Sequence, residues 1–344
     1  MENIGVQDII EKLANKDFVV FAGTGCVQGT GIPTWKTLLK ELKERCNDYK
    51  IRNRNVDKDL NESDYPSFAQ RIYDFLSENG RRSEYYETIR QNMQPTECEY
   101  TSQHIKIIKC THKIITTNYD NTFEKAYVDG FNKSNKQGLS TQSLPCLDIK
   151  KIHDGNSITY LHGRAFAEDV ILKKSDYERF YPSVSKNEIN STMHTTDLLE
   201  DFLKQIWKQE TMLFIGFSFS DICLLNLFQL FSEKTKQSDI ALSEWSTTNQ
   251  GGMLEHIQHY AFLPNLEMLI NSELQNRRTI YESNSIDEKT VKQEIERNTI
   301  DLNKSFKIAK IRPVRYSKHI IYQDWLDRIF NKQKKKKSLY QEQK

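Results

Sequence analysis

The chain has 344 residues, of which 49 are Lys or Arg and 47 are Asp or Glu, so its formal charge is +2. This length suffices for two domains or for one large domain with insertions. Five lysines fall within residues 332–337, and +2 less these five leaves −3 for the rest, which lacks the basic surface of a nucleic-acid-binding protein. We therefore expect no direct contact with nucleic acid. Residues 332–344 are predicted to be a flexible basic tail, although its lysines could also contact phosphates or a partner.

The six cysteines are scattered, and no two of them form a C-x-x-C pair. This spacing favours neither a zinc site nor a dense disulfide frame, and it is typical of reduced thiols in a cytosolic protein. The N-terminal residues alternate charged and apolar side chains at helical spacing, unlike a signal peptide, and no apolar run approaches the roughly 18 residues of a membrane span. The sequence predicts a soluble, cytoplasmic protein with no membrane contact.

The first elements predicted are an amphipathic N-terminal helix and then a buried strand in DFVVFAG (17–23), which runs into a glycine-rich loop. A second amphipathic helix follows in TWKTLLKELKERC (34–46). Strand, glycine loop and helix make up half of a nucleotide-binding unit. Residues 51–110 carry helical patterns and few strand signals, so we predict a helical insertion there.

Strands then alternate with helices to the end of the chain. Residues 130–155 are polar and predicted to be a peripheral excursion, while helices are expected in 173–181, 187–208 and 265–304. The further predicted strands are KIITTNYD (113–120), SITYLHG (157–163), TMLFIGFSFSD (211–221), HYAFL (259–263) and FKIAKIRPVRY (306–316). This alternation predicts an α/β fold, a Rossmann-like parallel sheet with helices on both faces, in one domain over residues 1–331.

Ligands of open parallel sheets bind beyond the carboxyl ends of the strands, and four predicted strands end in unusual polar sequences. Gly23 and Gly25 would let the backbone turn tightly and approach a phosphate. Their spacing, G-x-G-x-x-x-G, differs from the dinucleotide fingerprint, and no P-loop lysine follows. A standard dehydrogenase or NTPase is therefore disfavoured.

Four motifs resemble those of the sirtuin family, and they occur in the family's order. GTGCVQGTGIP (23–33) resembles the G-A-G-x-S-x-x-x-G-I-P signature, TTNYD (116–120) the T-Q-N-x-D motif, LHG (161–163) the strand with the catalytic histidine, and GFS (216–218) the G-T-S motif. The forms NYD, DYERFY and FIGFSFSD resemble a bacterial sirtuin-like branch of anti-phage defence. Members of that branch hydrolyse NAD to nicotinamide and ADP-ribose.

The chain also departs from the family. Val27 stands where the family has a serine in the phosphate loop, and Thr24 replaces the alanine. Residues 164–210 contain no cysteine, whereas sirtuins that deacylate proteins carry two C-x-x-C pairs there for a structural zinc. We therefore expect no zinc module.

The resemblance implies Asn118 and His162 as the catalytic residues. Asn118 would orient a ribose hydroxyl or the attacking water, and His162, expected to titrate near neutrality, would accept a ribose proton or activate water. Asp120 would fix the nicotinamide carboxamide or Asn118 itself. The residues implied in NAD binding are Gly23, Thr24, Gly25, Gly31, Ile32, Pro33, Thr117, Asp120, Gly216, Ser218 and Asp221.

Simpler roles compete with these assignments. Asn118 and Asp120 could cap the helix that follows them, and Asp221 could cap the helix that begins with ICLLNLF. The other seven histidines show no metal-ligand spacing, so we assign them to surface or core.

The resemblance implies an NAD glycohydrolase that depletes NAD in abortive infection. Such an enzyme needs restraint, so we expect a homo-oligomer, and a separately encoded HerA-type ATPase is the partner that the resemblance suggests. Two alternatives remain: an NAD-dependent protein deacylase, and a non-enzymatic subunit that binds NAD or ADP-ribose.

Overall fold

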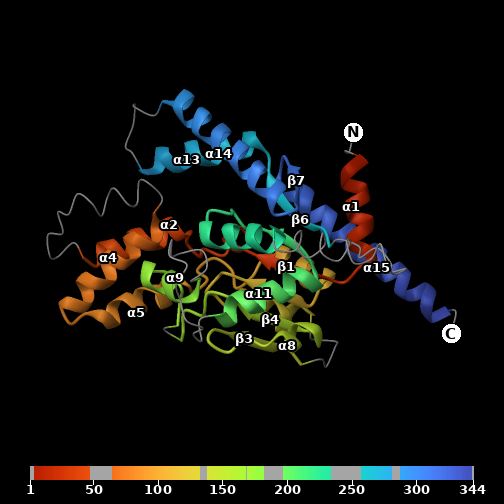
Figure 1. The fold of residues 1–344 in the computed structure, drawn as a ribbon, viewed down its shortest axis with the longest axis horizontal. Coiled ribbons are helices and arrows are strands. Elements are labelled where there is room, and N and C mark those ends of the chain that lie inside the picture. Colours follow the sequence, from red (N-terminus) through yellow and green to blue (C-terminus); the bar gives the residue numbers. More distant parts are fainter. Residues whose placement is uncertain are drawn as a thin grey trace, which may run out of the picture. The chain divides into compact units, whose positions relative to one another are not determined.

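A computed structural model describes residues 4–46, 64–131, 138–167, 169–181, 197–233, 257–280 and 287–342. The strands in these ranges form a seven-stranded sheet in the order β3-β4-β2-β1-β5-β6-β7 (Figure 1). The predicted α/β class with a parallel sheet is confirmed. The chain divides into two compact units, which we call the first unit, Val20–Ile206, and the second unit, Met1–Val19 with Trp207–Lys344.

Parallel strands of the first unit carry the first three sequence motifs. Its strands, with β1 crossing the unit boundary, are β1 (Phe18–Ala22), β2 (Lys113–Thr116), β3 (Ser140–Ser143) and β4 (Ser157–Tyr160). Ala22 pairs with Thr116, and Thr116 pairs with Tyr160. The three strands β1, β2 and β4 therefore end at the same level, and whatever follows them in sequence meets at one edge.

Strand β3 lies within the predicted peripheral excursion and was missed from the sequence. It pairs with β4 at the edge of the sheet and consists of polar residues only, Ser-Thr-Gln-Ser. An edge strand that is only partly buried needs no apolar run, so the usual strand signal was absent.

Helices make up most of the rest of the first unit. They are α2 (Trp35–Glu44), α4 (Tyr65–Glu78), α5 (Arg82–Asn92), α6 (Ser102–Cys110), α7 (Thr122–Ala126), α8 (Ile149–His153), α9 (Lys174–Phe180) and α11 (Asp197–Gln209), the last of which crosses the unit boundary. The described part of the predicted insertion contains α4, α5 and α6, while residues 51–63 lie outside the described residues. Likewise, the helix predicted over 187–208 is described only from Asp197.

A shared hydrophobic core joins α2, α4 and α5, and α9 packs against α4; these four helices lie together in Figure 1. Leu38 and Leu42 of α2 meet Phe68 of α4 and Ile89 of α5 there. The same core contains Tyr119, which lies between the two site residues Asn118 and Asp120. The helical insertion is thus packed directly against the segment that carries the second motif.

The second unit holds the other strands and the long helices. They are α1 (Ile4–Asn15), β5 (Thr211–Ile215), β6 (His259–Pro264), α13 (Leu266–Ile280), α14 (Glu288–Ile308), β7 (Ile311–Tyr316) and α15 (His319–Glu342). Strand β6 pairs in parallel with β5 on one side and with β7 on the other. None of the described helices is both long enough and apolar enough to span a membrane.

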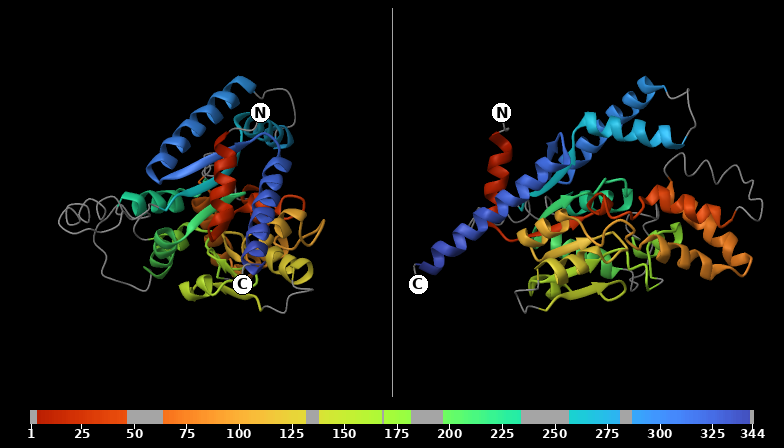
Figure 2. Two further views of the ribbon diagram at one scale, coloured as in Figure 1. Left: turned by 90° about the vertical axis from the view of Figure 1, so that its right-hand side faces the viewer. Right: turned by 180° about the vertical axis from the view of Figure 1, so that it is seen from behind.

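Most of the predicted flexible tail, residues 332–344, belongs to helix α15 in the structure. It continues through the lysine run to Glu342 and packs beside α1 (Figure 2). Lys332 lies 3.1 Å from Glu11, and Lys336 donates to Asn15 at 3.4 Å. Lysines have high helix propensity, and part of this run has partners on α1, so the charge run is helical rather than an unstructured tail.

Candidate functional site

Three strand ends bring Gly23, Asn118 and His162 to one edge of the sheet in the first unit. Each residue follows its strand by one or two positions, and the strands are in register. Asn118 Nδ2 donates to the carbonyl oxygen of Gly23 at 3.2 Å, which ties the second motif to the first. The prediction that these motifs belong to one place in the fold therefore has a geometric basis.

The glycine loop is shaped mainly by its own backbone. After Gly23 the chain makes a short 3-10 turn, Thr24–Val27, in which Cys26 N donates to Gly23 O at 3.0 Å. Thr30 is buried, and its hydroxyl donates to Val27 O at 2.6 Å. Gly31 has a φ of +80°, and a Cβ there would lie 1.9 Å from Thr96 Oγ1. Glycine at this position is thus required by conformation and by space.

Four more of the predicted contact residues, Thr24, Gly25, Ile32 and Pro33, belong to this loop. Thr24 and Gly25 form the first part of the turn, where N–H groups have no partner within the turn itself. Ile32 packs against the helical core, and Pro33 precedes Thr34, which caps α2 by accepting from Thr37 N at 3.3 Å. One N–H at the N-terminus of α2 is therefore already bound by its cap, and the turn after β1 offers further N–H groups to an anion.

Asn118 has an unsatisfied acceptor. Its side chain is buried, its backbone N donates to Thr116 Oγ1 at 3.1 Å, and its Nδ2 is held by Gly23. Among the described residues, nothing donates to its Oδ1. Buried polar atoms normally have partners, so this oxygen is a position for a ligand hydroxyl or a water. The capping role considered for Asn118 is not the one it has here.

Asp120 does act on the following helix. Its Oδ1 accepts from Thr122 N at 3.0 Å, at the start of α7, and also from the Thr122 hydroxyl. Burial raises the pKa of this carboxyl above its ordinary value, while the hydrogen bonds from Thr122 oppose that rise. The alternative role of Asp120 at the helix start is therefore real, and a role toward NAD would be additional.

His162 is enclosed by Tyr177 of α9 and by Tyr181, which directly follows that helix. Its Nε2 lies 2.8 Å from the hydroxyl of Tyr181, and its ring has edge contacts with Tyr177 and Tyr181. Burial lowers its pKa to about 3. The expectation that His162 titrates near neutrality is therefore wrong, because the sequence did not reveal that α9 folds over the ring.

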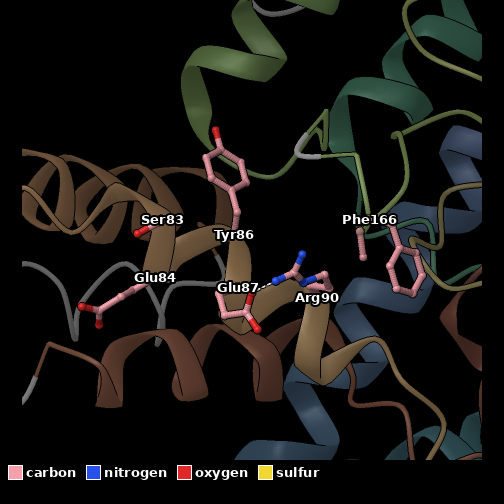
Figure 3. Close-up of a pocket in the computed structure, with 7 residues that line it drawn as sticks. Ser83, Glu84, Tyr86, Glu87, Arg90 and Phe166 are labelled. Atoms are coloured by element: carbon pink, nitrogen blue, oxygen red, sulfur yellow. Dashed lines mark hydrogen bonds and ion pairs between the residues drawn. The ribbon is translucent and has the colours of Figure 1, made fainter.

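A cavity of about 340 Å³ lies beside the segment that follows His162 (Figure 3). Ala165 and Phe166 of that segment form one side, and α5 of the helical insertion forms the other. Glu87 and Arg90 pair with each other across one turn of α5. Its remaining lining residues are Ser83, Glu84 and Tyr86. This cavity could not be predicted from the sequence, since none of its lining residues belongs to a motif.

The remaining predicted residues divide between the two units. Thr117 belongs to the first unit, where its N–H donates to Ala22 O at 3.3 Å. Gly216, Ser218 and Asp221 follow β5 in the second unit. Gly216 has a φ of +62°, Ser218 Oγ lies 2.7 Å from Ser220 Oγ, and Asp221 Oδ1 accepts from Leu224 N at 3.1 Å. Asp221 therefore caps its helix, as the alternative role proposed.

Neither metal ligation nor a reactive thiol stands out at the site. Within the described ranges, no group of three or more His, Cys, Asp or Glu side chains could hold a metal ion. Burial raises the pKa of the Cys26 thiol to about 12, which leaves it protonated and unreactive at neutral pH.

Comparison with known proteins places the chain in a family. Residues 112–287, half of the chain, match the family model of the SIR2-like domain. The chain belongs to the SIR2-like family. The matched range of this SIR2-like protein includes Asn118, His162 and the segment after β5.

Two curated relatives are named "NAD(+) hydrolase ThsA". The relative from Acinetobacter baumannii is 28% identical over 224 residues, which cover 64% of this chain and 40% of that protein. The relative from Cytobacillus dafuensis is 26% identical over 219 residues, covering 63% of this chain and 38% of that protein. This SIR2-like protein thus aligns with about two fifths of the length of these relatives.

Proposed function

We propose that this SIR2-like protein is an NAD glycohydrolase, which breaks the bond between nicotinamide and ribose and releases nicotinamide and ADP-ribose. The observation that carries the proposal is the buried, unsatisfied Oδ1 of Asn118 at the meeting point of three strand ends. The family and the two relatives named as NAD(+) hydrolases support the choice of substrate.

In the proposed reaction, nicotinamide leaves with the bonding electrons, and the electron-poor C1′ of the ribose takes up a water molecule. The water loses a proton, and ADP-ribose results. Asn118 Oδ1 accepts from a ribose hydroxyl or from this water, and its direction is fixed because Nδ2 is bound to Gly23 O. The open N–H groups of the turn after Gly23 bind the pyrophosphate.

His162 is neutral at pH 7 because its pKa lies near 3. So weak a base is a poor general base for the deprotonation of water. In the proposal His162 therefore positions a ribose hydroxyl or Tyr181 by hydrogen bonding. Asp120 holds the nicotinamide carboxamide or orients Asn118. The second-unit residues Gly216, Ser218 and Asp221 are proposed to contact NAD only by the family resemblance.

We further propose that the enzyme depletes NAD during anti-phage defence and causes abortive infection, acting in the cytoplasm as a homo-oligomer with a HerA-type ATPase as partner. These steps rest on the sequence resemblance. Light scattering during size-exclusion chromatography tests the oligomer, and co-purification with the ATPase encoded beside the gene, if one is present, tests the partner.

The activity is tested by nicotinamide release from NAD by the purified chain without any acylated peptide. We expect Asn118→Ala to abolish release, whereas Asn79→Ala, an exposed amide at the end of α4, should leave it unchanged. Release that requires an acyl-lysine peptide would establish the deacylase instead. NAD binding without release, with NAD levels in infected cells unchanged, would establish the binding subunit.

A further inference from the structure

A buried hydrogen-bond chain lies behind Asp120 and links it to α6. His104 Nε2 lies 3.2 Å from the hydroxyl of Thr122, and that hydroxyl contacts Asp120 Oδ1. His104 and Thr122 are fully buried, and Asp120 is 3% exposed. This hydrogen-bond chain therefore runs through the interior of the first unit, from the helical insertion to the second motif.

The direction of the chain follows from its far end. Thr101 N donates to His104 Nδ1 at 3.1 Å, and a backbone N–H can only donate. Nδ1 therefore carries no proton, so the neutral ring carries its proton on Nε2 and donates it to Thr122 Oγ1. The Thr122 hydroxyl, having accepted, is free to donate its own hydrogen to Asp120 Oδ1.

The ring cannot reverse this order easily. A second proton on His104 would place an N–H against the N–H of Thr101. Burial also lowers the pKa of His104 to about 4, so the ring is neutral at physiological pH. The tautomer is set by the fold, which makes His104 a permanent donor toward Thr122.

We propose that His104 and Thr122 are positioning residues, which hold Asp120 Oδ1 as a fixed acceptor and so orient the Asp120 carboxylate for NAD. This inference rests on the proposed function, since it assigns a purpose to Asp120 in NAD cleavage. It adds two residues that no sequence motif contains: His104 lies in the helical insertion, outside the range of the family match.

Other charged and titratable groups near Asp120 do not replace the chain. Cys26 on the glycine loop and Tyr160 on β4 interact with the carboxylate, but burial keeps both protonated at neutral pH. Glu124 on α7 acts on Asp120 as a like charge and is itself 2.8 Å from Arg164. The groups that lower the pKa of Asp120 are thus the two donors of Thr122 and the backbone N–H of Asp120 itself, and the Thr122 hydroxyl has the largest effect of these.

The test removes the hydroxyl of Thr122 and keeps the shape of its side chain. Thr122→Val removes the donor, Thr122→Ser keeps it, and Thr88→Val is the matched control, because Thr88 is also buried in the first unit and its hydroxyl donates to Glu84 O at 2.7 Å. We expect the acid limb of kcat/KM for NAD cleavage to move up by about one pH unit in Thr122→Val. Thr122→Ser and Thr88→Val should match the wild type.

A second measurement separates this inference from the proposed function. The carboxyl of Asp120, labelled with ¹³C and assigned by its loss in Asp120→Asn, should titrate at higher pH in Thr122→Val whether or not NAD is cleaved. An unchanged Asp120 titration and an unchanged acid limb would overturn the inference. If Thr122→Val does not fold, His104→Gln replaces it, with a smaller upward shift expected. A wild-type protein that never cleaves NAD refutes the proposed function. The NMR titration then still shows whether the hydrogen-bond chain from His104 through Thr122 acts on Asp120.

Discussion

Replacing Gly163 by alanine tests how tightly the segment after His162 is built. Gly163 has a φ of +81°, and a Cβ there would lie 1.5 Å from the carbonyl oxygen of Asp169 and 2.6 Å from its carbonyl carbon. Both are backbone atoms, so no side-chain rotation relieves the overlap. The left-handed conformation alone costs an L-residue about 1–2 kcal/mol.

The overlap adds to this cost through the neighbouring hydrogen bonds. Ile171 N donates to His162 O at 2.9 Å, and Tyr119 OH donates to Ile171 O at 2.7 Å. Moving Asp169 disturbs this segment, and one lost buried hydrogen bond costs about 1–3 kcal/mol. We therefore expect Gly163→Ala to lower the free energy of unfolding by about 2–5 kcal/mol.

Gly80→Ala is the matched control for this substitution. Gly80 lies in the same unit and has a φ of +71°, but a Cβ there meets nothing within 4 Å. It should lose only the conformational cost, about 1–2 kcal/mol. Urea unfolding followed by circular dichroism measures both variants. Equal losses for the two would refute the reasoning from overlap.

Three further predictions concern pH, thiols and a helix cap. Burial lowers the pKa of His104 to about 4 and the pKa of both His162 and His259 to about 3. Below about pH 6.5 only the unfolded chain takes up these three protons, so the free energy of unfolding decreases as pH falls, by up to about 4 kcal/mol per pH unit. Urea midpoints that stay constant from pH 7 to 5 would contradict this. A thiol reagent, followed by mass spectrometry, should modify the exposed Cys98 and Cys146 in the native protein and not Cys26; native labelling of Cys26 would count against the buried loop. Asp221→Ala should cost about 1 kcal/mol by urea unfolding, because Leu224 N loses its cap, and a rise in KM for NAD would reveal the binding role besides.

Sequence patterns located the elements whose signal is local. The strands β1, β2, β4 and β5 are buried along nearly their whole length. Short apolar runs predicted β1, β2 and β5, and the β-branched and aromatic residues of Ser-Ile-Thr-Tyr predicted β4. The polar β3 was missed, because pairing at a sheet edge leaves no such run. The lysine-rich end was taken for a tail because its partners on α1 are more than 300 residues away in sequence.

The candidate site shows the same division. Gly23, Asn118 and His162 could be placed together from the order of the motifs and the rule that ligands bind at carboxyl ends of parallel strands. The side chains that surround each of these three residues could not be predicted from the sequence. His104 looked like any core histidine, and its contact with Thr122 joins residues 18 positions apart. Tyr181, whose hydroxyl lies 2.8 Å from His162 Nε2, directly follows α9 and is 19 residues further along the chain.

These surroundings change what kind of catalyst the site can be. Asn118 offers a fixed acceptor, because its donor is already held by Gly23 O. His162 is neutral and already paired with Tyr181, so it has little capacity to carry a full proton. Cleavage of the nicotinamide bond needs stabilisation of an electron-poor carbon more than it needs a strong base, since the leaving group departs as a neutral molecule. A site of pre-oriented hydrogen-bond groups that need not take up a full proton suits that requirement, and in the proposed reaction Asn118, Asp120 and the glycine loop therefore carry the larger share.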